Sequence, residues 1–235
     1  MATTTRKRKR VSGNGKVRGA GNYDEQRAAL RKAELELIDQ IERVAQMRRR
    51  LPVVRRVKDY CFREGPPDLT VNAPTSFFET KLSELFAPGK DSLIIDHLMF
   101  REDDERACPM CSLWADGYDA VAKHITNKTN FVLVAKTDIG KLRDWARARG
   151  WHNLRLLSSQ GTSFNRDFGF EEDGDQLPGI SVFRRKDDGI YHFYAQRANP
   201  IPGRLRGIDL YTPVWNLFDT LPEGREDWLP EHFYH

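Results

Sequence analysis

The sequence predicts an α/β domain with a central mixed sheet flanked by helices, and with a long helix in front of it. Three observations support this prediction. Apolar runs of strand length alternate with helical stretches between residues 92 and 158, a hairpin pattern follows at 180–195, and residues 24–50 lack glycine and proline. Strands that alternate with helices give a parallel sheet, because parallel neighbours need a crossover connection. The hairpin then adds antiparallel strands.

Composition fits one folded domain with an extra arm. The chain has 235 residues, of which 39% are hydrophobic, enough for one substantial core. Residues 1–20 hold seven basic and no acidic side chains, so the net charge of +4 comes from this tail and the rest of the chain is mildly acidic. We expect a disordered basic tail at 1–22, a helical arm at 23–52 and a folded domain at 53–235. A nucleic-acid partner is not expected beyond nonspecific contacts of the tail.

We predict the cellular location from segments that the sequence does not contain. No stretch approaches the roughly 20 apolar residues of a membrane span, and no apolar signal segment follows the basic start. Only three cysteines occur, which excludes a disulfide-stapled secreted scaffold. We therefore expect a cytoplasmic protein without a membrane partner.

The predicted arm carries a narrow apolar stripe. Leu30, Leu37, Val44 and Leu51 recur at every seventh position, and Pro52 ends the helix. Such a stripe is buried either on its own domain or on a second copy of the helix. A homodimer through this helix is therefore one of two open possibilities.

The elements of the domain follow in order along the chain. Residues 53–62 form a strand-rich start and 77–86 a further element, and the apolar run at 92–100 is typical of a central strand covered on both faces. We then predict a helix at 108–127, a strand at 130–136, a helix at 138–149 between an Asp138 cap and Gly150, and a strand at 153–158. The hairpin strands are 180–185 and 190–195, turning at Gly189, before a short helix within 213–220.

The chemistry is concentrated at Cys108-Pro109-Met110-Cys111, which follows a predicted strand and opens a predicted helix. At a helix N-terminus, backbone amides and the helix dipole stabilise a thiolate on the first cysteine. Two intervening residues let the second cysteine reach back and resolve a mixed disulfide. Pro109 supports this arrangement because the first helical turn does not need its N–H. Cys108 and Cys111 are the candidate catalytic pair.

Simpler interpretations of the two cysteines compete. A zinc site needs more ligands than Cys61 alone can add, and His124 lies roughly 20 Å along the same helix. His97 ends the preceding strand and could support the site, although a hydrogen-bonded, half-buried role is the ordinary one. Both cysteines could also be inert packing residues. We predict no metal and no tightly bound cofactor.

Three more residues could support the dithiol. Trp114 and Asp116 follow on the same helix, where we expect them to pack around the cysteines. Pro178 precedes the first hairpin strand, in a loop that would lie opposite the start of the cysteine helix. A cis bond at Pro178 would present backbone groups to a substrate chain, and an ordinary trans bond is the alternative.

Several segments match, in order, those of a known family. They are Arg49–Pro52, His97–Phe100, Cys108–Asp116, Gly150-Trp151, Ser158-Ser159, Phe164–Gly169 and Leu177–Phe183. The chain thus resembles an uncharacterised bacterial thioredoxin-like family, domain of unknown function 899, over nearly all of its length after residue 24. The resemblance implies a thioredoxin-like fold and no settled activity.

A second likeness refines the expected fold. Leu156–Ser159 followed by Phe164–Phe170 looks like the strand and short helix that peroxiredoxins insert into the thioredoxin fold, which implies the peroxiredoxin-like variant. A peroxiredoxin would carry a lone peroxidatic cysteine, whereas here the cysteines are paired. The chain also differs from thioredoxin, because Ala107 precedes the motif where thioredoxin has a tryptophan.

These observations favour a thiol-disulfide oxidoreductase in which Cys108 attacks and Cys111 resolves. Its partners would be a protein or low-molecular-weight thiol or disulfide and an external reductant. Two alternatives stay open. One is a non-catalytic binding or scaffold protein of the same fold, and the other is a peroxiredoxin-like peroxide reductase.

Overall fold

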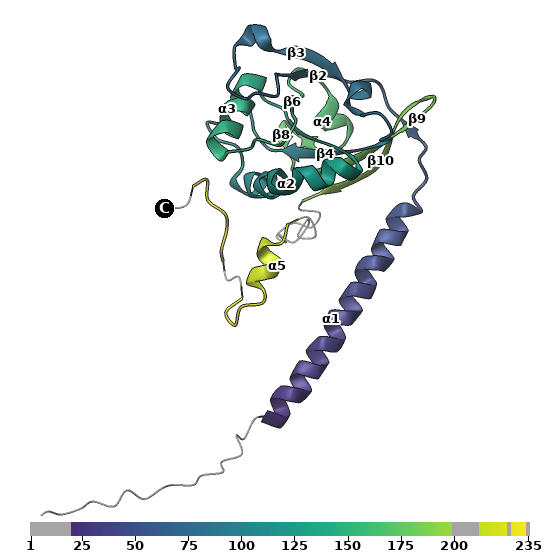
Figure 1. Cartoon of the computed structure of the whole chain (residues 1–235), viewed down its shortest axis with the longest axis vertical. Helices are drawn as coiled ribbons and strands as arrows, with labels where there is room; N and C mark the ends of the chain where they lie inside the picture. Colours follow the sequence, from purple (N-terminus) through teal and green to yellow (C-terminus); the bar gives the residue numbers. More distant parts are fainter. Residues whose placement is uncertain (1–19, 199–211, 225–226, 234–235) are drawn as a thin grey trace, which may run out of the picture. The chain divides into compact units, whose positions relative to one another are not determined.

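The structure is a computed structural model that describes residues 20–198, 212–224 and 227–233, drawn in colour in Figure 1. The chain divides into two compact units, 1–50 and 51–235. Of the predicted basic tail, residues 1–19 lie outside the described part. Every helix in the described part is too short or too polar to cross a membrane.

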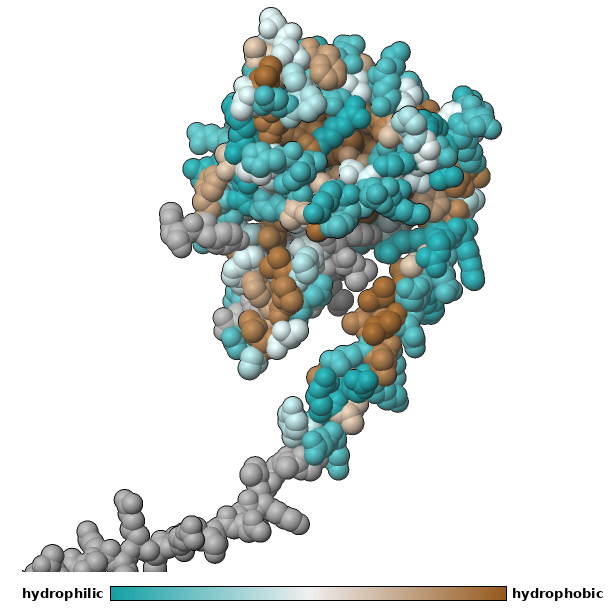
Figure 2. All heavy atoms as spheres, in the orientation of Figure 1, coloured by the Kyte–Doolittle hydropathy of each residue, from teal (hydrophilic) through white to brown (hydrophobic). Residues whose placement is uncertain are grey.

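The first unit contains the long helix α1 (Ala20–Arg49), which ends before Pro52 as predicted. Its apolar side chains are largely in water: Leu30, Leu37, Ile41 and Met47 are each 40–60% exposed. Figure 2 shows brown patches among the hydrophilic side chains of this helix. The pairing of this stripe with a second copy stays a prediction.

The second unit is built on an eight-stranded sheet in the order β1-β10-β9-β4-β5-β6-β2-β3. The neighbours β4, β5 and β6 are parallel, and all other neighbours are antiparallel, so the predicted mixed sheet is confirmed. The strands are β1 (Arg55–Arg56), β2 (Cys61–Glu64), β3 (Phe78–Lys81), β4 (Ser92–Leu98), β5 (Asn130–Ala135), β6 (Leu156–Ser158), β9 (Gly179–Lys186) and β10 (Gly189–Arg197). A separate small sheet pairs β7 (Glu171–Glu172) with β8 (Asp175–Gln176).

The helices of this unit begin and end where local chemistry requires. They are α2 (Pro109–Lys128), α3 (Ile139–Arg149), α4 (Phe164–Asp167) and α5 (Val214–Phe218). The Asp138 side chain caps α3 by accepting from the Lys141 N–H at 3.0 Å, and Gly150 ends it with φ 75°. Both predictions are confirmed. Gly150 fits because only glycine adopts a left-handed φ without a steric penalty.

Residues 77–86 differ from the predicted single element. They form β3, which pairs with β2, followed by a 3₁₀ turn at Leu82–Leu85. Two carboxylates hold this turn: Asp59 accepts from the Ser83 N–H at 2.8 Å, and Glu84 accepts from the Lys81 N–H at 2.7 Å. These side-chain bonds satisfy backbone donors that a continued strand would have used in a ladder.

Two apolar cores lie on opposite faces of the sheet, with β4 between them. One core holds Leu98 and the buried residues of α2 and α3, and the other holds Leu93, Ile95 and the phenylalanines of α4 and β9. Consecutive residues of β4 point to opposite faces, as in any strand. The predicted burial of this strand on both faces is confirmed. The topology is that of a thioredoxin-like α/β fold in its peroxiredoxin-like variant, with α4 following β6.

Candidate dithiol site

The dithiol lies where the loop after β4 runs into α2. The Cys108 N–H donates to the Met99 carbonyl at 3.0 Å, which pins the loop to the end of the strand. Cys108 is the N-cap of α2 and Pro109 is its first residue, as the sequence predicted. The Cys108 carbonyl accepts from both the N–H (2.9 Å) and the hydroxyl (3.0 Å) of Ser112. The backbone on both sides of the first sulfur is therefore fixed.

Cys108 is half-buried, and its sulfur lies at the first turn of α2. Interaction with the Cys111 thiol, and with the backbone N–H groups of Cys111 and Met110, lowers its pKa to about 6, although burial and the Asp104 carboxylate act in the opposite direction. At pH 7 this sulfur is mostly a thiolate, because the pH lies about one unit above the pKa. Thiolates, not thiols, attack disulfides.

Cys111 has the opposite character. Its side chain is 1% exposed, and burial raises its pKa well above the ordinary range. Donation of its own S–H to Cys108 adds to this rise, and the Met99 N–H opposes it only in part. The two sulfurs are therefore unequal: one is ionised and reachable, the other is protonated and enclosed. All three cysteines of the chain are free thiols in this structure.

Asp96 belongs to the site, and the sequence analysis missed it. It lies on β4 with its side chain 1% exposed, and burial raises its pKa to about 8. Its Oδ1 has no hydrogen-bond partner in the described structure, and its charge acts on Cys111. A signal was present in the sequence, because a carboxylate interrupts an otherwise apolar strand, and ionisable groups are seldom buried without a role.

His97 lies next to Asp96 in sequence and on the other face of the sheet. Its Nε2 is 2.7 Å from the Ser181 hydroxyl, and its ring stacks on Phe170 with 3.7 Å between centroids. Burial, followed by nearby His192, lowers its pKa to about 3. The structure places this side chain in the aromatic core and fully buried, not half-buried at the dithiol. Strand alternation explains the difference.

Trp114 and Asp116 lie three and five residues after Cys111 on α2. Trp114 is buried in the same core as Cys111, as expected for a packing residue. The Asp116 carboxylate instead pairs with Arg149 and accepts from the indole N–H of Trp151 at 2.7 Å. This carboxylate ties α2 to the end of α3, so its role is to join two helices.

Pro178 lies before β9, which pairs antiparallel with β4, so its loop reaches the end of the sheet from which the cysteine loop starts. The bond before it is trans. The Leu177 N–H donates to the Phe170 carbonyl at 2.9 Å, and the Pro178 carbonyl accepts from Ala198 at 2.8 Å. These backbone groups are thus bonded within the chain, which corrects the expectation that a cis bond would offer them to a substrate.

The C-terminal segment was not predicted to approach the site. The His232 Nε2 donates to the carbonyl of Ala107, the residue before Cys108, at 3.0 Å. The Phe233 ring lies 6.0 Å from that of Trp145, and the Arg106 guanidinium stands 5.8 Å from the Phe233 ring centre. The sequence shows only an aromatic, proline-containing end. A contact across more than a hundred residues leaves no local pattern to find.

The remaining cysteine does not join the pair. Cys61 lies on β2, which is separated from β4 by β5 and β6, and its thiol donates to Glu79 at 3.5 Å. Among the residues that the structure describes, no three His, Cys, Asp or Glu side chains are placed to hold a metal ion. The chemistry that the described side chains offer at this site is that of a thiolate, a thiol and a buried carboxyl group.

Comparison with known proteins places the chain in a family. Solved structures that resemble it include oxidised Prx3 from Vibrio vulnificus (14% identity, 64% of this chain and 90% of that one, TM-score 0.43) and a putative thioredoxin reductase from Burkholderia cenocepacia (16%, 66% and 90%, 0.48). AhpC from Enterococcus faecalis is another (12%, 76% and 98%, 0.48). No curated protein matches the sequence. The family model for bacterial protein of unknown function (DUF899) matches residues 13–234, and the chain belongs to this family.

Proposed function

We propose that the protein is a thiol-disulfide oxidoreductase that uses Cys108 as nucleophile and Cys111 as resolving thiol. The observation that carries this proposal is the asymmetry of the pair at the start of α2: Cys108 is half-buried, whereas Cys111 is 1% exposed. The pKa values agree with it, because interaction with Cys111 lowers the pKa of Cys108 to about 6 while burial raises that of Cys111. A thiolate poised beside a protonated thiol is what a two-step exchange requires.

In the first step, the Cys108 thiolate attacks one sulfur of a substrate disulfide. A bond forms between Cys108 Sγ and that sulfur, the substrate S–S bond breaks, and the other substrate sulfur leaves as a thiolate that takes a proton from water. The half-exposed position of Cys108 allows the approach, because Cys111 is enclosed and could not meet a substrate first.

In the second step, the ionised form of Asp96, which is the minor form below about pH 8, takes the proton of the Cys111 thiol, and the Cys111 sulfur attacks Cys108 Sγ. The bond from Cys108 to the substrate breaks, and the second substrate sulfur leaves as a thiol after protonation. Asp96 suits this role because its charge acts on Cys111 and its Oδ1 is unpartnered. A carboxyl group with a pKa of about 8 exchanges protons readily near neutral pH.

The products are a reduced substrate and a Cys108–Cys111 disulfide, so a further turnover needs an external dithiol reductant. The same steps in reverse would oxidise a substrate dithiol. The equilibrium between the two directions is set by the reduction potential of the pair relative to that of its partners.

The decisive experiment is a thiol count by mass spectrometry across a graded series of dithiothreitol redox buffers. We expect one reversible disulfide between Cys108 and Cys111 with a definite midpoint potential. Cys108→Ser and Cys111→Ser should each abolish it. Cys61→Ser is the matched control and should leave the midpoint unchanged, because Cys61 lies on a distant strand.

A second measurement tests the mechanism at the nucleophile. In the Cys111→Ser variant, a mixed disulfide with a substrate should accumulate at Cys108, because no thiol remains to resolve it. Two thiols that neither pair nor react until the protein is denatured would contradict the proposal and leave a binding or scaffold protein. Oxidation by hydrogen peroxide at rates far above those of any disulfide would favour a peroxide reductase instead.

A further inference from the structure

We propose that this dithiol is selective for disulfides that carry positive charge close to the sulfur atoms, and that the carboxylates of the loop before Cys108 determine this selectivity. The inference rests on the proposed oxidoreductase function and names its substrate class. It is carried by charges from two separate segments of the chain that meet at Ala107, the residue before the nucleophile.

The first segment is the loop at residues 102–105, which consists of four consecutive acidic residues. Glu102, Asp103 and Glu105 are exposed, and none of them forms an ion pair with another described residue. Asp104 accepts from the Arg101 N–H at 3.1 Å, and its charge acts on the sulfur of Cys108. The loop therefore imposes a negative potential on the atom that must meet the substrate.

The cations of the same region do not cancel this charge. Arg101 pairs with Asp175 at 2.9 Å, and Lys141 donates to the carbonyl oxygens of Arg101 and Glu102. The guanidinium of Arg106 lies over an aromatic ring. This region therefore has three cations, and it has five carboxylates, namely those of residues 102–105 and of Asp175.

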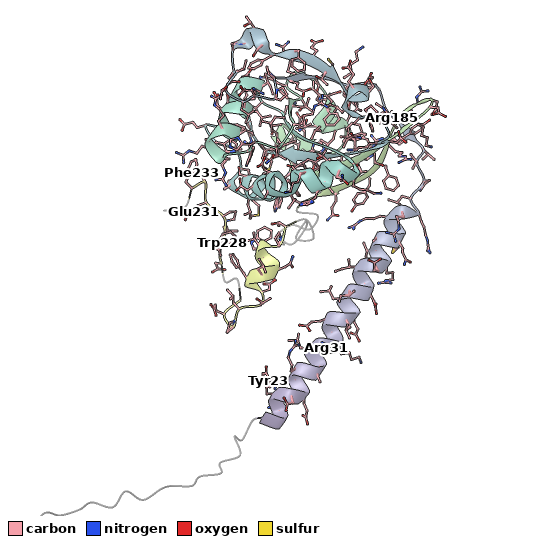
Figure 3. All side chains as sticks on the ribbon, viewed as in Figure 1. Tyr23, Arg31, Arg185, Trp228, Glu231 and Phe233 are labelled. Carbon is pink, nitrogen blue, oxygen red and sulfur yellow. The ribbon has the colours of Figure 1, made fainter. Side chains whose placement is uncertain are left out.

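The second segment is the C-terminal one. In sequence, residues 212–235 contain five acidic side chains and one basic side chain, Arg225. The bond from His232 to the carbonyl of Ala107 holds this segment beside the loop, and Glu231 is the neighbour of His232. Figure 3 shows Trp228, Glu231 and Phe233 on this stretch, which lies next to α3 through the contact of Phe233 with Trp145. The Arg149 guanidinium also contacts the His232 carbonyl and the Phe233 ring, but it is paired with Asp116. The charge that this segment adds next to the bond at Ala107 is therefore that of Glu231.

The chemistry converts this potential into selectivity. During exchange, negative charge spreads over the attacking, central and leaving sulfurs, so a nearby cation on the substrate stabilises the transition state. Carboxylates around the site attract that cation during approach and repel an anionic disulfide such as glutathione disulfide. Because these charges are exposed, the effect must fade at high salt. The preferred substrate is a disulfide next to lysine, arginine or amine groups.

The test uses three small disulfides of similar size and different charge: cystamine (dication), 2-hydroxyethyl disulfide (neutral) and 3,3′-dithiodipropionate (dianion). Second-order rates of disulfide formation in the reduced full-length protein are measured by stopped-flow and divided by the rates of free dithiothreitol with the same probes. At low ionic strength we expect cystamine to react at least about tenfold faster than the dianion after this correction, and we expect the ratio to approach one in about 1 M salt.

Two matched variants locate the effect. Asp104→Asn with Glu105→Gln removes two charges beside Cys108, and the amide of Asn keeps an oxygen for the Arg101 N–H. Asp187→Asn with Asp188→Asn removes two charges at the β9–β10 turn, at the other end of β9 from Pro178. By the same steering argument, the first pair of substitutions should lower the ratio of the cystamine rate to the dianion rate by at least about threefold. The second pair should leave the ratio unchanged.

The outcomes separate this inference from the function on which it rests. Equal corrected rates for the three probes, or a ratio that the Asp104 and Glu105 substitutions do not change, would overturn the inference while leaving the oxidoreductase intact. No reaction with any probe would overturn the function itself. Peptide disulfides flanked by lysine or by glutamate then distinguish the two possible sources of a positively charged disulfide. Faster reaction of the lysine peptide would support a basic polypeptide as the substrate. A preference for cystamine without a preference for the lysine peptide would support a small amine disulfide.

Discussion

Asp96 and His97 are neighbours on β4 and both are fully buried, but their side chains lie on opposite faces of the sheet. The His97 ring is bonded to Ser181 and stacked on Phe170, in a core of phenylalanines. Asp96 has an unpartnered Oδ1 and acts on a thiol. Each side chain also has one buried atom without a hydrogen-bond partner in the described structure, His97 Nδ1 and Asp96 Oδ1, so the difference lies in the groups that the two side chains face.

The difference teaches that burial of an ionisable group does not by itself mark a working site. Burial shifts both pKa values, that of Asp96 up to about 8 and that of His97 down to about 3. Asp96 acts on the Cys111 thiol, whereas the ionisable neighbour of His97 is His192, on the face away from the dithiol. The face of the sheet, which depends on one step along the strand, decides which of the two side chains meets the cysteines.

The largest expected effect is on the free energy of unfolding, and it concerns the aromatic core on the His97 face of the sheet. Phe164 is fully buried and its ring lies 4.9 Å from Phe62 and 5.6 Å from His97. Phe164→Ala should lower the free energy of unfolding by about 3–5 kcal/mol, because it leaves a cavity. Urea unfolding measures this loss. The pH midpoint of Cys108 alkylation should stay near 6, and a large shift would show that the two faces are coupled.

The second effect separates the two polar neighbours by rate. Asp96→Asn should slow resolution of the mixed disulfide about 100-fold at pH 7, because general acid-base catalysis is lost. His97→Gln should leave this rate nearly unchanged, because its side chain lies on the other face. Single-turnover kinetics with a chromogenic disulfide resolve the second step. If His97→Gln slowed that step as much as Asp96→Asn, the assignment of faces to roles would be wrong.

The third effect is a pair of opposed pH dependences of stability. Between about pH 4 and 8 the folded state keeps a proton on Asp96 that the unfolded state releases near 3.8, so this group makes stability fall as pH rises. Between about pH 3 and 6.5 the unfolded state protonates His97 and the folded state does not, so this group makes stability fall as pH drops. Each slope is about 1.4 kcal/mol per pH unit.

The pH slopes of stability from Asp96 and from His97 oppose each other between about pH 4 and 6.5. A variant of each residue removes one slope and so reveals it. Relative to the native chain, Asp96→Asn should gain stability as pH rises to about 8, whereas His97→Gln should gain it as pH falls below about 6.5. Urea titrations at five pH values give both differences. Parallel curves for the native chain and either variant would mean that the group does not titrate between its two expected limits.

The smallest effect is expected at the loop beside the dithiol. Pro178→Ala should lower the free energy of unfolding by only about 0.4–1 kcal/mol, mainly through a freer unfolded chain. Exchange rates should not change, because the neighbouring backbone groups are already bonded within the chain. A large loss of rate with an unchanged fold would show that this loop meets the substrate after all.

Local patterns in the sequence sufficed for much of the molecule. The apolar run of β4, the Asp138 cap and Gly150 stop of α3, and the placement of Cys108 at the start of α2 each depend on residues a few positions apart. Interactions within one turn or one strand decide such features, so the sequence can be read for them directly. The position of the Cys108–Cys111 motif at this helix start belongs to this part, and the roles of the two sulfurs are our proposal.

Only the tertiary structure decided which groups surround those cysteines. Strand pairing fixes the face on which Asp96 and His97 lie, and a one-residue shift would exchange them. The carbonyl of Ala107 is bonded by His232 from the far end of the chain, and the loop of Pro178 is held by Ala198. These contacts join residues that are distant in sequence. Their partners are selected by the packing of the whole domain, so no local pattern encodes them.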